Sequence, residues 1–271
     1  MKSGIRVLQI SVVAFALSTT LLSQQKPLRV FIRSSAKTHG PGAHDYPAFL
    51  ESWTKLLTQR GAVVDGAERF PTAVELSKTD VMINYSSDGA NVSPGDRVIQ
   101  EAYLKRGGGI VVIHDAMCGG DAVWYASVIG AAKQHGERNS AAGKKTLHFT
   151  DLGNPIVKGM PADFEMQDEM FFLLRASGLS PGVDGKPAMW TYGMKVDPGI
   201  RVLATTPDPQ GNVVPQIWTY EKTLLAGQPY RAFVSLFGHA VTSFEIPEFQ
   251  TILLRGIAWA GNRPADTLLN K

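Results

Sequence analysis

Short apolar runs alternate with amphipathic segments through the first half of the chain. The run at residues 80–85 is almost continuously apolar, as expected of a parallel strand that is buried on both faces. From Tyr46 onward the apolar residues fall at helical spacing, and Ser93 followed by Pro94 is typical of a helix start. The predicted strands are residues 28–33, 62–64, 80–85 and 110–113, and the predicted helices begin at Tyr46 and near Ser93.

This alternation of strands and helices predicts an α/β fold, in which a doubly wound, mainly parallel sheet carries helices on both faces. The second half is less regular, but it contains apolar runs at residues 144–150, 201–205, 213–220 and 231–236, and a closing helix with Pro247 in its first turn. The sequence shows no internal repeat, low-complexity tract or linker. We therefore expect a single domain over residues 27–265.

Residues 1–23 have the composition of a signal peptide. Lys2 and Arg6 precede an apolar stretch that ends in small and hydroxyl-bearing residues. The stretch is short for a stable membrane span, which needs about 20 mostly apolar residues. We expect cleavage after Ser18 or near Ser23, export to the periplasm or the medium, and no stable membrane span afterwards. The alternative is an uncleaved anchor at the membrane surface.

Charge and cysteine content narrow the classes of function. Without Lys2 and Arg6, 25 basic residues stand against 24 acidic ones, so the chain lacks the basic surplus of a nucleic-acid-binding protein. Cys118 is the only cysteine, which rules out an intramolecular disulfide. The sequence contains neither a G-x-G-x-x-G nor a Walker motif, so nucleotide binding is not supported. The oligomeric state stays open.

Histidines follow three of the predicted strands. His39 and His44 lie in the loop after the first strand, His114 ends the fourth, and His239 follows the run at 231–236. Open α/β sheets bind ligands at the carboxyl ends of their strands. A lone histidine in such a loop is more often a surface or capping residue, but the joint placement of His114 and His239 favours a shared site.

The loop at residues 38–47 places two further candidates beside its histidines. In one interpretation this loop is a turn in which Asp45 caps the following helix. In the other, it brings His39, His44, Asp45 and Tyr46 to a bound substrate.

Residues 107–116 consist of three glycines, an apolar strand, His114, Asp115 and Ala116. In class I glutamine amidotransferases a similar strand ends in a tight turn with a nucleophilic cysteine, and His114 occupies that position here. Imidazole is a proton shuttle or a ligand rather than a nucleophile for glutamine hydrolysis, so a glutaminase is disfavoured. Because Cys118 lies past this turn, a thiol enzyme is the weakest hypothesis.

An ordered set of motifs resembles the ThuA-like (trehalose-utilisation) family of the class I glutamine amidotransferase-like superfamily. The set comprises residues 107–116 with Trp124, Gly130 and His135, and the segments 154–161, 167–170, 215–220, 237–239 and 255–260. The resemblance covers residues 28–262. It implies a flavodoxin-like, amidotransferase-like fold and a link to the catabolism of disaccharides, including oxidised (3-keto) glycosides.

Asp168 and Glu169 are adjacent carboxylates on a predicted strand, so their side chains point to opposite faces and only one can line a given site. That one is interpreted as a general base or as the partner of a histidine, and the alternative is an ion pair with an arginine. Histidine with carboxylate also suits a divalent metal such as zinc, with His114 and His239 as candidate ligands.

The first hypothesis is a carbohydrate-active lyase, isomerase or hydrolase. His114 and His239 would be its acid–base or ligand residues, with Glu169 or Asp168 as partner. The second is a non-catalytic carbohydrate-binding module on the same scaffold. In both, the partner is a small-molecule carbohydrate, and the candidate substrate contacts are His39, His44, Asp45, Tyr46, His135 and Trp218. Tyr46, Trp124 and Trp218 are candidates for stacking on a sugar ring, although Trp124 is better explained as core.

Overall fold

The structure is a computed structural model that describes residues 26–180 and 189–269. The predicted leader at residues 1–23 lies outside these ranges. Within them, none of the helices combines the length and the apolar character that a membrane crossing needs. The buried apolar side chains form one core cluster that reaches from Leu28 to Leu268.

One half of the central sheet is parallel, as the sequence predicts. Its strands are β1 (Arg29–Arg33), β2 (Val63–Ala67), β3 (Val81–Asn84), β4 (Gly109–Ile113) and β12 (Pro229–Ser235). They are ordered β2-β1-β3-β4-β12, and every neighbouring pair is parallel. The predicted α/β class is therefore confirmed. The order reverses beside β1, so the loops after the strands converge on one edge of the sheet.

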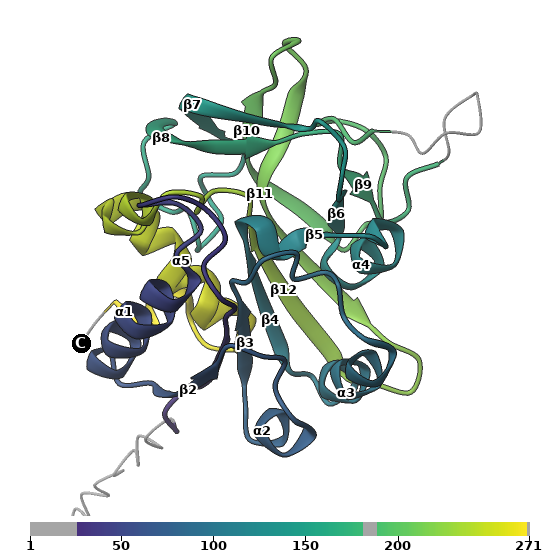
Figure 1. The fold of residues 1–271 in the computed structure, drawn as a ribbon. Coiled ribbons are helices and arrows are strands. Elements are labelled where there is room, and N and C mark those ends of the chain that lie inside the picture. The colour runs from purple at the N-terminus through teal and green to yellow at the C-terminus, as the bar shows by residue number, and fades with distance from the viewer. Residues whose placement is uncertain (1–25, 181–188, 270–271) are drawn as a thin grey trace, which may run out of the picture.

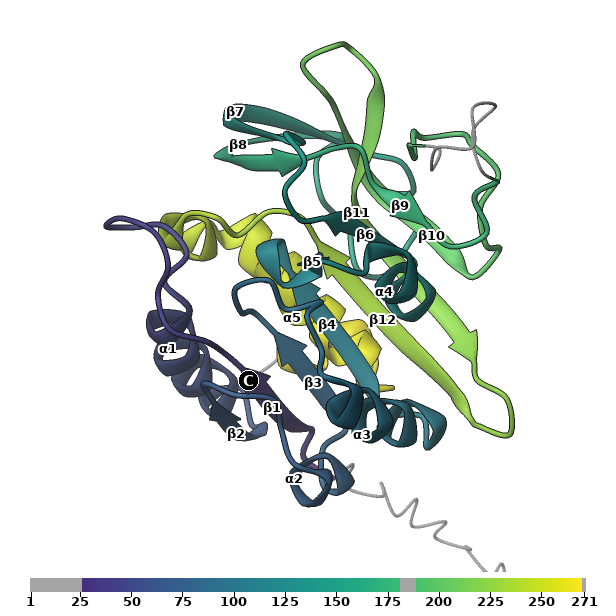
Figure 2. The same ribbon diagram turned by 45° about the vertical axis from the view of Figure 1, so that its right-hand side comes forward.

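Helices cover both faces of this half (Figures 1 and 2). They are α1 (Tyr46–Gln59), α2 (Ala73–Ser77), α3 (Pro94–Lys105), α4 (Ala122–Ile129) and α5 (Pro247–Ala260). The side chain of Asp45 accepts a hydrogen bond from the Ala48 amide and caps α1, and Ser93 caps α3 in the same way. Both predicted helix starts are confirmed.

The glycines before β4 allow close packing. Gly107 ends α3 in a left-handed conformation, with φ of 87°. A Cβ atom on Gly109 would lie 2.0 Å from the carbonyl oxygen of Ala260, so only glycine lets β4 pass the end of α5 this closely.

The other half of the sheet is antiparallel. It adds β11 (Val213–Thr223), β10 (Ile200–Pro207), β7 (Ser140–Phe149) and β8 (Asp163–Phe171), in that order beyond β12. In Figures 1 and 2, β7 and β8 lie beyond the carboxyl ends of β3 and β4. The antiparallel strands therefore curl over the parallel ones, and β8, the last strand of the sheet, returns to the edge where the histidines lie.

Several shorter elements complete the fold. A small sheet contains β5 (Cys118–Gly119), β6 (Ala131–Gln134) and β9 (Arg175–Ala176). The 3-10 helices in the described part of the chain are η1 (His114–Met117), η2 (Val241–Glu245) and η3 (Ala265–Leu268). The sequence pattern did not indicate these elements, because each is too short to show a periodicity.

Candidate functional site

Three histidines and one carboxylate converge at the carboxyl edge of the parallel strands. The residues are His44, His114, Glu169 and His239, and one ligand atom from each lies within 4.8 Å of the others. Nε2 of His44 is 3.0 Å from Nε2 of His114 and 2.9 Å from Nδ1 of His239. Oε2 of Glu169 is 3.5 Å from Nε2 of His114 and 3.4 Å from Nδ1 of His239. We call these four residues the histidine cluster.

Two loops hold His44 and His239 against each other. The amide of His44 donates to the carbonyl of His239 over 3.0 Å, and the amide of Val241 donates to the carbonyl of Gly42 over 2.9 Å. The two loops therefore form a short antiparallel bridge at Ala43 and Ala240. His44 has a φ of 44°, a left-handed conformation that is uncommon outside glycine and is a feature of functional sites.

His114 is fixed from both sides. It follows β4 directly and has a left-handed φ of 50°. Its ring is fully buried and stacks on Phe171, with ring centres 4.6 Å apart. Nδ1 lies 2.7 Å from the carbonyl oxygen of Leu236 and must donate to it, because a carbonyl can only accept. In the neutral ring, Nε2 then carries a lone pair that points to the cluster, the arrangement typical of metal-binding histidines.

The two adjacent carboxylates of β8 separate into two roles, as the alternation of a strand requires. Glu169 faces the histidines. Asp168 is buried and accepts hydrogen bonds from the amides of Gly238 and His239, at 3.1 and 3.0 Å, and from the hydroxyl of Ser243. Asp168 was a catalytic candidate, but the structure makes it a residue that anchors the His239 loop.

The four side chains of the cluster differ in the direction of their pKa shifts. Burial, together with the nearby His114 and His239 rings, lowers the pKa of His44 to about 3. Burial also lowers the pKa of His114. Burial raises the pKa of Glu169, but the hydrogen bond from His239 and the charge of His114 outweigh this and bring that pKa down to about 2. The same hydrogen bond raises the pKa of His239. At neutral pH, His44 and His114 are therefore uncharged and Glu169 is a carboxylate.

The spacing of the cluster suits a metal ion. Zinc lies about 2.0–2.2 Å from histidine nitrogens and carboxylate oxygens. Two ligands at about 2.1 Å from one centre are about 3.0 Å apart at right angles and about 3.4 Å apart at the tetrahedral angle. The nitrogen–nitrogen separations of 2.9 and 3.0 Å and the nitrogen–oxygen separations of 3.4 and 3.5 Å match these values. His44, His114, Glu169 and His239 could therefore hold one divalent cation.

The four candidate residues in the loop after β1 have different surroundings. His44 belongs to the cluster, and the exposed His39 lies beside it, with ring centres 3.8 Å apart. Asp45 caps α1 and pairs with Lys37 at 3.4 Å, so its side chain is already engaged. Tyr46 is buried and donates its hydroxyl to Asp115 over 3.2 Å. Because Tyr46 is buried, sugar stacking by its ring does not agree with its position, and substrate contact by Asp45 stays a prediction.

The remaining candidates lie outside the histidine cluster. His135 is exposed, and its Nδ1 pairs with Asp88 at 2.6 Å. Trp218 is fully buried and donates its indole N–H to the carbonyl of Ile129, so the predicted stacking on a sugar is wrong. Trp124 is half-buried under Arg97, whose guanidinium lies 3.6 Å from the ring centre.

Cys118 is buried at the end of η1, outside the histidine cluster. Burial and the nearby Asp115 carboxylate raise the pKa of its thiol well above the usual value. A thiolate nucleophile is therefore disfavoured at this position.

The supporting residue Asp115 was missed by sequence reasoning. It accepts from the amide of Asp88 over 3.1 Å as well as from Tyr46, and it lies directly after His114. The sequence did contain a signal for Asp115, because a carboxylate directly follows a histidine at the end of a strand. That signal does not reveal which groups the carboxylate binds.

Comparison with known proteins agrees with this architecture. Residues 29–260 match the profile of the ThuA family, described as trehalose utilisation, so the chain belongs to that family. No curated protein shows a significant match to the chain.

Several solved structures share the fold. A putative ThuA-like protein from Bacteroides uniformis is 18% identical with a TM-score of 0.61, covering 87% of this chain and 92% of its own. A second, from Parabacteroides merdae, is 18% identical with a TM-score of 0.57 and covers 88% and 92%. The N-terminal domain of an IFT52 protein is 11% identical with a TM-score of 0.54 and covers 86% and 96%. At these identities the likeness concerns the fold alone.

Proposed function

We propose that this chain acts on a sugar or an oxidised (3-keto) glycoside in carbohydrate catabolism, with the histidine cluster as its reaction centre. Family membership supports the link to sugar utilisation. The observation that carries the proposal is the convergence of three imidazole nitrogens and one carboxylate oxygen within 4.8 Å. Such a cluster combines proton transfer with metal ligation, and both serve lyase, isomerase and hydrolase chemistry.

We further propose that the cluster holds a divalent metal such as zinc. The ligand atoms are spaced as neighbours around one cation, and the bond of His114 Nδ1 to Leu236 keeps Nε2 of the neutral ring unprotonated. Asp168 would not bind the metal itself, but it fixes the backbone of His239 by accepting a hydrogen bond from the His239 amide. Bound there, the metal would polarise a substrate carbonyl and lower the pKa of a coordinated water.

The chain's own residues would then bind and deprotonate the substrate. His39 is exposed next to the cluster, with its ring centre 3.8 Å from that of His44 and 5.8 Å from that of His239. We assign His39 to substrate contact and to proton exchange with a sugar hydroxyl. Phe171 and the buried loop backbone would exclude water from behind His114.

An activity panel with 3-keto and unmodified disaccharides, run with and without a chelator, tests this function. We expect turnover of at least one keto-glycoside, its loss on chelation and its recovery with added zinc. His148→Ala is a matched control, because His148 is an exposed histidine that pairs with Asp163 at 2.6 Å, at the end of the β7–β8 pair opposite to Glu169. Binding of these sugars without turnover would instead support the non-catalytic carbohydrate-binding module.

We also propose that residues 1–23 direct export and are removed, because a basic start and a short apolar stretch are typical of a leader. The intact mass of protein recovered from the periplasm or medium tests this. We expect loss of about two dozen residues, and full-length protein there would contradict cleavage.

A further inference from the structure

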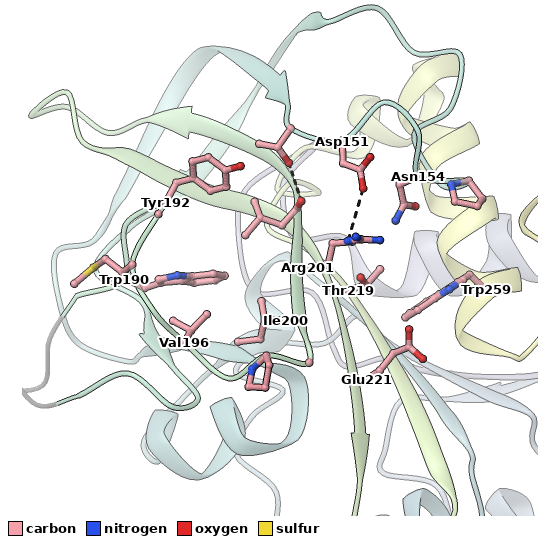
Figure 3. A pocket seen from close by; sticks show the side chains of 17 residues that line it. Asp151, Asn154, Trp190, Tyr192, Val196, Ile200, Arg201, Thr219, Glu221 and Trp259 are labelled. Atoms are coloured by element: carbon pink, nitrogen blue, oxygen red, sulfur yellow. Dashed lines mark hydrogen bonds and ion pairs between the residues drawn. The ribbon is translucent and has the colours of Figure 1, made fainter.

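A groove lies on the antiparallel half of the sheet (Figure 3). Its volume is about 940 Å³, within the range of about 300–1,000 Å³ that is usual for small-molecule sites. Its walls are the segment around Trp190 and Tyr192, the loop at Asp151 and Asn154, and Trp259 of α5. None of the four residues of the histidine cluster lines it. We call it the β10–β11 groove.

The groove crosses the edge of β10, where residues 200–202 pair with β11 and not with β7. On β11, Trp218 and Tyr220 point to one face, where they bond to Ile129 and Asp197. Thr219 and Glu221 therefore point to the other face, which is the face that carries α5. There Glu221 lies near Trp259, and both line the groove (Figure 3).

The charges of the groove are paired within the protein. Arg201 lies 3.7 Å from Asp151, and Glu221 lies 3.5 Å from Arg231 at the groove's edge. A groove whose acidic and basic groups neutralise each other offers little attraction to an anion such as phosphate. It still presents hydrogen-bonding groups on both walls, which suits an uncharged polar ligand.

Aromatic rings lie at opposite ends of the groove. Tyr192 is 49% exposed, and Trp259 is half-buried at the opposite wall (Figure 3). Trp190 is buried against Trp218 and forms a wall rather than a platform. The amide of Asn154 and the hydroxyl of the buried Thr219 line the groove on the side of Trp259 (Figure 3). A pyranose ring has an apolar C–H face and a rim of hydroxyls, so this combination of rings and polar groups matches it.

We propose that the β10–β11 groove is a saccharide-binding site, separate from the histidine cluster, that takes a short neutral oligosaccharide. One sugar ring packs on Trp259 and another on Tyr192, while hydroxyls bond to Asn154, Thr219 and the Arg201–Asp151 pair. The site would bind the oligosaccharide without taking part in the reaction at the cluster. It stands whether or not the cluster is catalytic.

Amide and indole N–H NMR signals, recorded during titration with maltotriose or trehalose up to about 10 mM, test the proposal. We expect shifts at the Trp259 indole and the amides of Tyr192 and Thr219. Tyr192→Ala removes a half-exposed ring and should keep the fold, and it should weaken binding by about three- to tenfold. Thr219→Val keeps the shape of the residue and should also weaken binding.

Two controls separate this proposal from the function of the cluster. His239→Ala should leave groove binding unchanged even if it abolishes turnover. Leu225→Ala, at a residue that is 91% exposed and lies outside the groove, should also change nothing. The proposal is overturned if neither sugar shifts the groove signals, if Tyr192→Ala and Thr219→Val leave binding intact, or if inorganic phosphate binds there more tightly than maltotriose.

Discussion

The two halves of the sheet contribute to the histidine cluster in different ways. The parallel half supplies His114 at the end of β4, and the loops after β1 and β12 supply His44 and His239. This is the edge where open α/β sheets bind ligands. The antiparallel half supplies Glu169 from β8, which is the last strand of the sheet and four positions beyond β12.

Glu169 reaches the histidines because the antiparallel strands curl over the carboxyl edge of the parallel ones (Figure 2). Asp168 secures this contact by bonding to the His239 loop. The comparison teaches that the parallel half positions the imidazoles, while the antiparallel half supplies the negative charge. Variants that act on one half or the other can therefore separate the two contributions.

Removing a histidine of the parallel half should have the largest effect. We expect His114→Ala and His239→Ala each to lower kcat/KM by about 10³-fold or more, and the double variant to be little worse, because residues that act as a unit are non-additive. Turnover and melting temperature of all three variants check this. If both single variants melt lower yet turn over normally when folded, the two histidines do not share a site.

The two carboxylates of β8 should give opposite results. Glu169→Gln removes a ligand charge, so it should lower metal affinity and turnover by at least about 10- to 100-fold, the loss usual for groups that only support the ligands, with little change in stability. Asp168→Asn should leave buried donors poorly satisfied and cost about 1–3 kcal/mol of unfolding free energy. Zinc titration and thermal unfolding of both variants measure this difference. The reverse result would place Asp168 in the reaction centre.

The pH dependence of metal affinity should follow the protonation of His239. Its pKa is raised by Glu169, so a metal must displace a proton from His239 as the pH falls through that pKa. Glu169 and His44, with pKa values of about 2 and about 3, are already deprotonated above pH 5 and add no slope. Zinc affinity should therefore fall by about tenfold per pH unit below that pKa. Competition titrations between pH 5 and 8 measure it, and a flat profile would argue against His239 as a ligand.

Cys118→Ser should have the smallest effect. The thiol is buried and its raised pKa keeps it protonated, so turnover should stay within a few-fold of the wild-type value. Steady-state kinetics with a circular dichroism control check this. A loss of about 10³-fold with the fold intact would restore the thiol mechanism.

The parallel half could be predicted from the sequence because its signals are local. Buried strands such as β3 and β4 are continuous apolar runs, and the starts of α1 and α3 carry capping residues. His114 and His239 were assigned to the carboxyl edge because each directly follows a strand signal. His44 was assigned only to substrate contact, since a loop histidine carries no mark of its partners.

The antiparallel half could be predicted only in part. The runs at β7, β10 and β11 were recognised, but their pairing and curl depend on contacts between residues far apart in sequence. For that reason the sequence could not decide between Asp168 and Glu169. The sequence also led us to predict that Trp218 stacks on a sugar. The ring instead packs in the core against α4, and its indole N–H donates to the carbonyl of Ile129.

Metal content and metal location test the central claim, that residues from both halves form one metal-binding centre. The direct measurement is elemental analysis of the purified chain, followed by anomalous diffraction at the absorption edge of the metal found. We predict one divalent ion per chain, bound by His44, His114, Glu169 and His239, lost in His44→Ala and retained in His135→Ala. A chain that stays metal-free after incubation with zinc, or that binds it away from these four residues, would contradict the account.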